Sequence, residues 1–327
     1  MRRIVVRLFA LLVVVLGASL SSPARADEGG ASFWLPGQFG SLAAVPTDAG
    51  ASLGAVYFHQ TASSNASMAF QVGGQIALGL DVDVDLLFLV PTYTFDTPVL
   101  GGQAALSLTA ILGQLRVGAN ATLSGPNGGV IAASKSDSII GGGDLFPQGT
   151  LKWNDGNNNY MLYTMAGIPT GAYQATRLAN LGSNHWAIDA GGGYTYLNAT
   201  SGLEFSAVVG ATYNFENSET NYQNGVDGHF DWAVSQFVSE ATHVGLVGYF
   251  FQQLTGDSGA GAKLGDFKGR VSAVGPQVGT TFPLLFGDGT AKGYVNLKGY
   301  WEFDAANRPS GWNAWLTVSV PLGAARN

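Results

Sequence analysis

The sequence has 327 residues, of which 47 are glycine and none is cysteine, so a disulfide framework and a thiolate zinc site are excluded. Charged residues make up 11 % of the chain, against roughly 25 % in an ordinary soluble domain, and 46 % of the residues are hydrophobic, which excludes an acidic disordered chain. The net charge of −7 disfavours nucleic-acid binding, because that binding depends on neutralising phosphates with Lys and Arg.

The first 26 residues have the three parts of a secretory signal peptide. Three arginines flank or precede an apolar run over residues 8–16, and Ala24 and Ala26 provide the small residues that a signal peptidase reads. The apolar run is shorter than the roughly 20 residues that a spanning helix needs. We therefore expect residues 1–26 to be removed during export, with a short membrane anchor as the alternative.

Residues 27–50 precede the first regular segment and show no alternation. The stretch over 32–46 is apolar and is interrupted by glycine and proline, so it is not typical of a strand that faces lipid. We expect residues 27–50 to form an N-terminal segment that plugs the lumen of the barrel predicted below, with a further strand as the alternative. The candidate plug residues are Phe33, Trp34, Leu35 and Phe39.

From residue 51 onward, apolar and polar residues alternate with a period of two. In the run from Leu203 to Phe215, the odd positions are apolar and the even positions include Glu204. Since successive side chains of a strand point to opposite faces, each such run predicts a strand with one apolar and one polar face. About thirteen strands are expected, near residues 51–59, 68–81, 84–95, 103–121, 143–153, 159–168, 185–196, 203–215, 229–238, 242–254, 271–282, 291–303 and 312–320.

Two architectures fit this pattern. A soluble antiparallel protein would bury the apolar faces in a core, whereas an outer-membrane barrel turns them to lipid and turns the polar faces to the lumen. Connections that alternate between short and long, long strands, and aromatic residues near strand ends favour the barrel. We predict an all-β fold, a transmembrane antiparallel up-and-down β-barrel over residues 51–322, followed by a tail over 323–327.

A closed single-chain bacterial barrel has an even number of strands, so thirteen segments imply 12 to 14 strands. The alternating loop lengths place the C-terminus in the periplasm. Counted back through thirteen segments, they would start the 51–59 strand on the outside of the membrane.

Blocks of the sequence resemble outer-membrane proteins of the "MetA-pathway of phenol degradation" family. Among them are SFWLPGQFGSLAAVP (32–46), GDLFPQGTLKW (143–153) and NLKGYWEFDAANRPSGWNAWLT (296–317). The resemblance covers nearly the whole chain after the leader. It implies a β-barrel in the outer membrane of a Gram-negative bacterium, linked to the uptake of aromatic or other hydrophobic compounds. The N-terminal segment is also distantly similar to the lumen plug of outer-membrane fatty-acid transporters.

The resemblance further implies contact with outer-membrane lipid and lipopolysaccharide, and insertion by the barrel-assembly machinery. The chain departs from many barrels at its end, which reads PLGAARN rather than closing on an aromatic residue. The last strand is therefore expected to stop near Leu322.

The sequence contains no strong motif for a metal, a cofactor or a catalytic site, and we predict none of these. The four histidines lack the spacing of a metal motif. Asp81, Asp83 and Asp85 are similar to the start of a calcium loop, but Leu86 stands where that loop needs glycine. These carboxylates are expected on the water side of a strand end, with a cation-bridging role as the alternative.

Two sets of residues are candidates for the path of a solute. Charged and amide side chains on the polar strand faces are expected inside the lumen, because a charge that faces lipid at the midplane costs a few kcal/mol. They either contact solute or only fill the interior: Gln71, Gln75, Asp189, Glu204, Asp231, Lys292, Lys298 and Glu302. The aromatic loop residues Tyr173, Tyr222 and Phe267 form either an apolar patch where a hydrophobic compound enters or a folded loop cap.

Together these patterns predict passive uptake of a small hydrophobic or aromatic solute, without enzymatic activity. One alternative is a structural or surface-interaction barrel that transports nothing. Another is a hydrolase of envelope lipid that uses Ser239 and His243, although no third catalytic residue is indicated.

Overall fold

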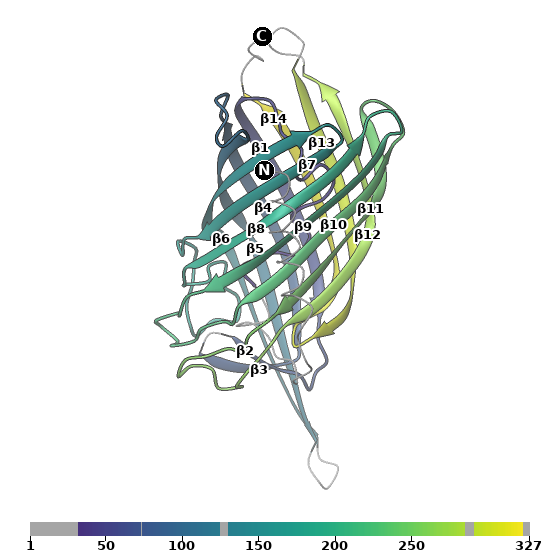
Figure 1. Cartoon of the computed structure of the whole chain (residues 1–327). Helices are drawn as coiled ribbons and strands as arrows, with labels where there is room; N and C mark the ends of the chain where they lie inside the picture. The colour runs from purple at the N-terminus through teal and green to yellow at the C-terminus, as the bar shows by residue number, and fades with distance from the viewer. Residues whose placement is uncertain (1–31, 73, 125–129, 285–290, 323–327) are drawn as a thin grey trace.

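Twelve β-strands close into one antiparallel barrel in the computed structural model, which describes residues 32–72, 74–124, 130–284 and 291–322 (Figure 1). Each strand pairs with its neighbours around the ring, and β1 (Gly50–Ser63) closes the barrel on β14 (Ser310–Pro321). Within the described ranges, no helix has the length and apolar character to cross a membrane. The predicted transmembrane β-barrel is confirmed, with 12 strands.

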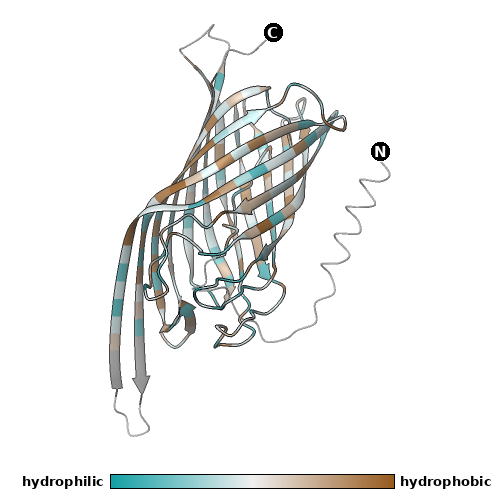
Figure 2. Ribbon diagram, turned by 90° about the vertical axis from the view of Figure 1, so that its left-hand side faces the viewer, coloured by the Kyte–Doolittle hydropathy of each residue, from teal (hydrophilic) through white to brown (hydrophobic). Residues whose placement is uncertain are grey.

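The remaining barrel strands follow the chain order. They are β4 (Leu80–Thr94), β5 (Gln103–Ser124), β6 (Val130–Asp155), β7 (Asn158–Gly167), β8 (Ala187–Asn198), β9 (Leu203–Asn214), β10 (Asp227–Phe237), β11 (Thr242–Gln253), β12 (Arg270–Pro283) and β13 (Lys292–Ala306). Strand β6 begins well before the expected residue 143, because it pairs with β5 along almost its whole length. These two strands extend beyond the others at one end (Figure 2).

The strand expected over residues 68–81 is wrong. Residues 69–78 instead form a small hairpin outside the barrel, in which β2 (Ala69–Val72) pairs with β3 (Gln75–Leu78). Gly79 ends the hairpin with a φ of +57°, and a Cβ at this position would lie 2.7 Å from the Ala66 Cα. Only glycine adopts this backbone there without strain. The hairpin removes one barrel strand and makes the strand number even.

The two ends of the barrel differ in their connections. One end, which we call the turn end, carries tight turns over 156–157, 199–202 and 238–241. The opposite loop end carries the β2–β3 hairpin and the loops over 168–186, 215–226 and 254–269. Strand β1 begins at the turn end, where β14 stops, so the expectation that residue 51 starts on the outside is wrong. It followed from counting thirteen strands.

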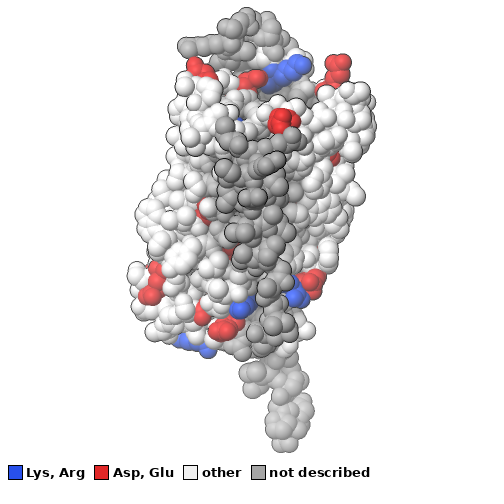
Figure 3. Space-filling view, viewed as in Figure 1, with Lys and Arg blue, Asp and Glu red and all other residues white. Residues whose placement is uncertain are grey.

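Burial separates the two faces of most strands as the alternation predicts. On β9, Glu204 is fully buried inside the barrel, whereas Phe205 and Tyr213 point outward and are exposed. On β13, Lys298 is buried and Trp301 is 62 % exposed. Charged side chains gather near the two ends of the face seen in Figure 3, with a broad band of few charges between them. A surface of this kind matches the apolar belt of a membrane barrel.

The leader over 1–26, residues 27–31 and the tail over 323–327 lie outside the described residues. Their assignment as signal peptide, start of the N-terminal segment and C-terminal tail therefore stays a prediction.

Candidate functional site

The N-terminal segment over residues 32–49, which we call the lumen segment, is bound to inward-facing side chains of the barrel. Asp231 of β10 accepts hydrogen bonds from the backbone N–H groups of Gly37 and Phe39 at 3.0 and 3.1 Å. Lys298 of β13 donates to the Gly37 carbonyl at 2.6 Å and, at longer range, to the carbonyls of Gln38 and Phe39. A carboxylate and an ammonium group thus bind the same turn of backbone.

A second anchor holds the next part of the lumen segment. Glu204 of β9 accepts from the Leu42 N–H at 3.0 Å and from the Ser41 hydroxyl at 2.6 Å. Thr195 of β8 accepts from the Ala44 N–H at 3.1 Å. Only a segment inside the lumen can reach inward-facing groups of β8, β9, β10 and β13.

Aromatic rings fix the start of the lumen segment. Trp34 is almost fully buried and stacks on the His229 ring with 3.6 Å between the ring centroids. The His229 Nε2 lies 2.9 Å from the Asp189 carboxylate, so the stack is continuous with a buried polar pair. Phe33 packs against Phe146 of β6, with 5.5 Å between the ring centroids.

Phe39, another candidate plug residue, packs on Tyr163 of β7 with 5.5 Å between the ring centroids. Leu35 lies against an interior cavity. All four candidate plug residues therefore have partners inside the barrel.

Six of the eight residues predicted to line the lumen lie on barrel strands, and they divide into three groups. Asp189, Glu204, Asp231 and Lys298 are buried inside the barrel. All four bind the lumen segment or its His229 partner. Glu302 is half-buried and accepts hydrogen bonds from Gln60 and Tyr249. Lys292 is exposed at the turn end of β13.

The placement of Gln71 and Gln75 in the lumen is wrong, because both residues belong to the β2–β3 hairpin. Gln71 is buried there and binds the backbone of Gly261 and Lys263 in the loop over 254–269. Gln75 binds the Thr176 carbonyl. Both amides join the hairpin to neighbouring loops.

The aromatic loop residues are mostly internal to the loops. Tyr222 is buried and donates to the Asp257 carboxylate, and Phe267 is buried edge-on against Phe70 of the hairpin, at 6.2 Å between centroids. Tyr173 alone of the three lines the interior cavity. The burial of Tyr222 and Phe267 favours the folded loop cap over an exposed apolar patch.

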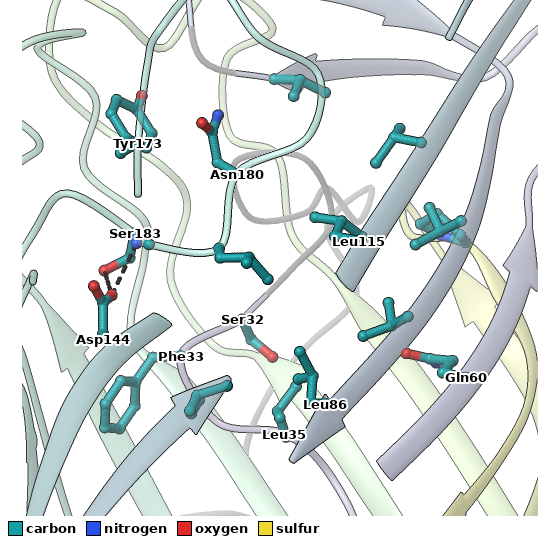
Figure 4. Close-up of a pocket in the computed structure, with 18 of the residues that line it drawn as sticks. Ser32, Phe33, Leu35, Gln60, Leu86, Leu115, Asp144, Tyr173, Asn180 and Ser183 are labelled. Atoms are coloured by element: carbon teal, nitrogen blue, oxygen red, sulfur yellow. Dashed lines mark hydrogen bonds between the residues drawn. The ribbon is translucent and has the colours of Figure 1, made fainter. Parts of the chain in front are cut away.

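A cavity of about 280 Å³ lies inside the barrel toward the loop end, between the lumen segment and the loop over 168–186. Among the side chains that line it, Figure 4 labels Phe33 and Leu35 of the lumen segment, Leu86 of β4 and Leu115 of β5. Its walls are mainly aliphatic and aromatic. The apolar lining also includes Phe58, Val82, Val84, Ile111, Val117, Phe146, Leu178 and Leu181.

On most strands polar side chains face the lumen and apolar side chains face outward. Strand β4 does the opposite near the loop end, and its apolar side chains form part of the cavity wall. Near the loop end of β4, Val82, Val84 and Leu86 face the interior, while Asp81, Asp83 and Asp85 face outward. The aspartates bind side chains of the adjoining strands: Asn120, Thr61, Tyr57 and His59. Placing a carboxylate on the outer face of a barrel costs little free energy away from the midplane of the bilayer. The aspartates can therefore lie on the outside near the loop end.

The polar part of the cavity wall is held by Asp144 of β6. Its carboxylate accepts hydrogen bonds from the Gly171 N–H at 2.8 Å, and from the Ser183 N–H and hydroxyl at 2.8 and 2.7 Å (Figure 4). These bonds attach the loop over 168–186 to the barrel wall. The carboxylate is therefore structural and occupied by three donors.

Sequence reasoning missed this cavity because it turned the apolar face of every strand to lipid. The alternation Asp81-Val82-Asp83-Val84-Asp85 contained the relevant signal. Three carboxylates on one strand face cannot lie deep in lipid. Had the aspartate face been assigned to the outer surface above the bilayer, the valines on the opposite face would have been placed inside the barrel.

Ser239 and His243, the pair considered for a hydrolase, bind different partners. Ser239 lies in the turn over 238–241, where its hydroxyl accepts the Thr242 N–H at 3.0 Å. The His243 Nε2 lies 2.9 Å from the Tyr294 hydroxyl. Among the residues that the structure describes, no group of three His, Cys, Asp or Glu side chains is placed to hold a metal ion.

Comparison with known proteins gives one family and several similar structures. Residues 66–318 match the family described as "Putative MetA-pathway of phenol degradation". None of the curated proteins compared matches the chain. The chain is similar to the crystal structure of the COG4313 outer membrane channel from Pseudomonas putida F1, with a TM-score of 0.63 and 16 % identity, over 84 % of this chain and 96 % of that one.

A FadL homologue from Pseudomonas aeruginosa is more distant, with a TM-score of 0.41 and 9 % identity over 82 % of this chain and 89 % of that one. The β domain of the Bordetella autotransporter BrkA has a TM-score of 0.44 and 10 % identity over 84 % of this chain and all of that one, 100 %. The likeness to the Pseudomonas putida channel supports the fold alone.

Proposed function

We propose that this chain, which belongs to the MetA-pathway of phenol degradation family, is an outer-membrane barrel for the passive uptake of small hydrophobic or aromatic solutes in a Gram-negative bacterium. In this role the exposed apolar band contacts membrane lipid and lipopolysaccharide. The interior binds and releases the solute, and no chemical step is required.

The interior cavity of about 280 Å³ is the observation that carries the proposal. An apolar cavity of roughly 150 Å³ in a protein core stays dry and binds benzene, so this one has room for a single ring with substituents. Its position toward the loop end suits capture of a solute that arrives from outside. Uptake driven by a concentration gradient needs no further domain.

The lumen segment acts as a plug in this proposal. Asp231, Lys298 and Glu204 bind its backbone across the barrel, between the cavity and the turn end. A solute that leaves the cavity toward the turn end meets this segment, so its release requires the segment to shift locally. The bonds that hold the plug thereby set how often the path opens.

The experiment fills the cavity without changing the outer surface. Leu86→Trp adds a larger side chain on the inward face of β4, whereas Leu87→Trp adds the same side chain on the exposed face one residue away. The measurement is the initial rate at which intact Gram-negative cells take up radiolabelled benzyl alcohol, with and without the protein. Heat-dependent gel mobility verifies that each barrel is folded.

We expect wild-type protein and Leu87→Trp to raise the rate equally, and Leu86→Trp to lose most of that gain. A wild-type rate no higher than that of cells without the protein would refute the proposed function. A full gain with Leu86→Trp would show that solute bypasses the cavity, and would refute the path.

A further inference from the structure

We propose that the cavity selects solutes that carry a carboxylate, with Arg308 as the group that binds it. The solute class is then a small aromatic or short aliphatic monocarboxylate. Its apolar part would lie against the aliphatic wall, and its charged end against the guanidinium group. This inference rests on the proposed function, because it names the solutes that the same cavity takes.

Arg308 is a buried cation at the edge of an apolar space. It lies in the turn between β13 and β14 at the loop end, lines the cavity, and is only 9 % exposed. Its Nε is buried and has no hydrogen-bond partner among the residues that the structure describes. Within the described part of the chain, Arg308 takes part in none of the ion pairs, all of which join other residues.

The surroundings fix the guanidinium group without neutralising it. The Arg308 Cζ lies 5.0 Å from the centroid of the buried Phe251 ring, a cation–π contact that covers one face of the group. Its charge acts at longer range on Asp227 and Tyr249. The ion pairs of the described residues include none between Arg308 and Asp227. The N–H groups at the edge of the plane are left to an incoming acceptor.

A carboxylate is the ligand that suits these edges. Burying an arginine is costly unless an anion and its hydrogen bonds compensate for the lost water. The planar guanidinium group presents its N–H donors in a fork that matches the two oxygens of a carboxylate. A carboxylate on the solute would supply the partner that the described chain lacks.

The other ionisable groups on the cavity wall do not compete for this role. The Asp144 carboxylate is occupied by three donors from the loop over 168–186. His185 is buried, and its desolvation lowers the pKa of its imidazole, which keeps the ring neutral near pH 7. Among the described residues that line the cavity, Arg308 is therefore the cation.

The test uses two aromatic probes of similar size, one of which is an anion and one of which is neutral. Benzoate, ionised near neutral pH, and neutral benzyl alcohol are titrated into the purified full chain in detergent by calorimetry. Arg308→Gln removes the cation, and Arg308→Lys keeps the charge but loses the fork. Arg270→Gln is the matched control, since Arg270 lies at the same end of the barrel outside the cavity and pairs with Asp304 at 2.9 Å.

We expect Arg308→Gln to weaken benzoate binding by about 10- to 100-fold, as the loss of charged hydrogen bonds predicts. Benzyl alcohol binding should stay within about twofold, Arg308→Lys should retain part of the benzoate affinity, and Arg270→Gln should equal the wild type. Unchanged gel mobility of all variants verifies folding.

The outcomes separate this inference from the uptake proposal. Benzoate binding that survives Arg308→Gln, or benzyl alcohol binding without benzoate binding, would overturn the carboxylate inference and leave uptake of neutral solutes standing. If neither probe binds although wild-type cells still gain benzyl alcohol uptake, the inference also fails and the solute path lies elsewhere. No binding together with no uptake would overturn both.

Discussion

Replacing Lys298 with methionine tests whether the barrel controls the lumen segment through its backbone. The Lys298 ammonium donates to three consecutive carbonyls, the shortest bond being 2.6 Å to Gly37. Methionine has nearly the same length and no charged donor. It therefore removes these bonds, and with them the cation–π contacts of the Lys298 Nζ with Tyr300 and Trp315. The carbonyl groups are then left inside the barrel without their partner.

The magnitude follows from the bonds that are lost. A hydrogen bond to a charged group contributes about 1.5–3 kcal/mol. Of the three bonds only the shortest has a strong geometry, and Asp231 still holds the neighbouring N–H groups. We therefore expect local opening of the lumen segment to become easier by about 3 kcal/mol, which is roughly a hundredfold in population.

Hydrogen exchange at the Gly37 and Phe39 amides measures this opening directly, because exchange reports local unfolding free energies. Lys292→Met is the control, since it removes the same charge from an exposed position on the same strand. We expect faster exchange only in the Lys298 variant, together with a higher ionic conductance in planar membranes. Equal exchange in both variants would refute the idea that Lys298 holds the segment.

Two further predictions concern the loop end. Burial raises the pKa of Asp257 to about 7, although the hydrogen bond that Tyr222 donates to its carboxylate lowers this pKa. Its protonated form is thus favoured in the folded loops, so the free energy of loop opening should fall, by up to about 4 kcal/mol, as pH rises from about 4 to 7. Asp257→Asn should abolish this dependence in hydrogen exchange, and a pH-independent wild type would contradict it. Gly79→Ala should destabilise the hairpin by about 1–2 kcal/mol, because it adds a Cβ against Ala66 to a strained φ. Gly101→Ala at a φ of +74°, where no described residue lies within 4 Å of the added Cβ, should cost less in thermal unfolding, and equal losses would count against the contact.

The parts of the fold that could be predicted are those in which lipid and lumen sort side chains residue by residue. On β9 and β13, outward Phe205 and Trp301 alternate with inward Glu204 and Lys298, because each side chain faces either the lipid or the lumen. The family match to residues 66–318 agrees with the resemblance noted in the sequence.

The prediction failed where that sorting no longer applies. In the β2–β3 hairpin both Phe70 and Gln71 are buried, because loops cover both faces, and alternation there says nothing about lipid. Arg308 was missed for another reason. The position of Arg308 against Phe251 depends on the pairing of β11, β12, β13 and β14, and no local pattern encodes it.

The way in which the barrel holds the lumen segment has a consequence for how this protein can diverge. Asp231, Lys298 and the Glu204–Leu42 bond all engage peptide groups, which every residue type except proline supplies in full. Side chains of that segment can therefore be exchanged while its attachment persists. If the proposed uptake is correct, substitutions near Leu35 can change which solutes the cavity accepts while the backbone attachment of the segment persists.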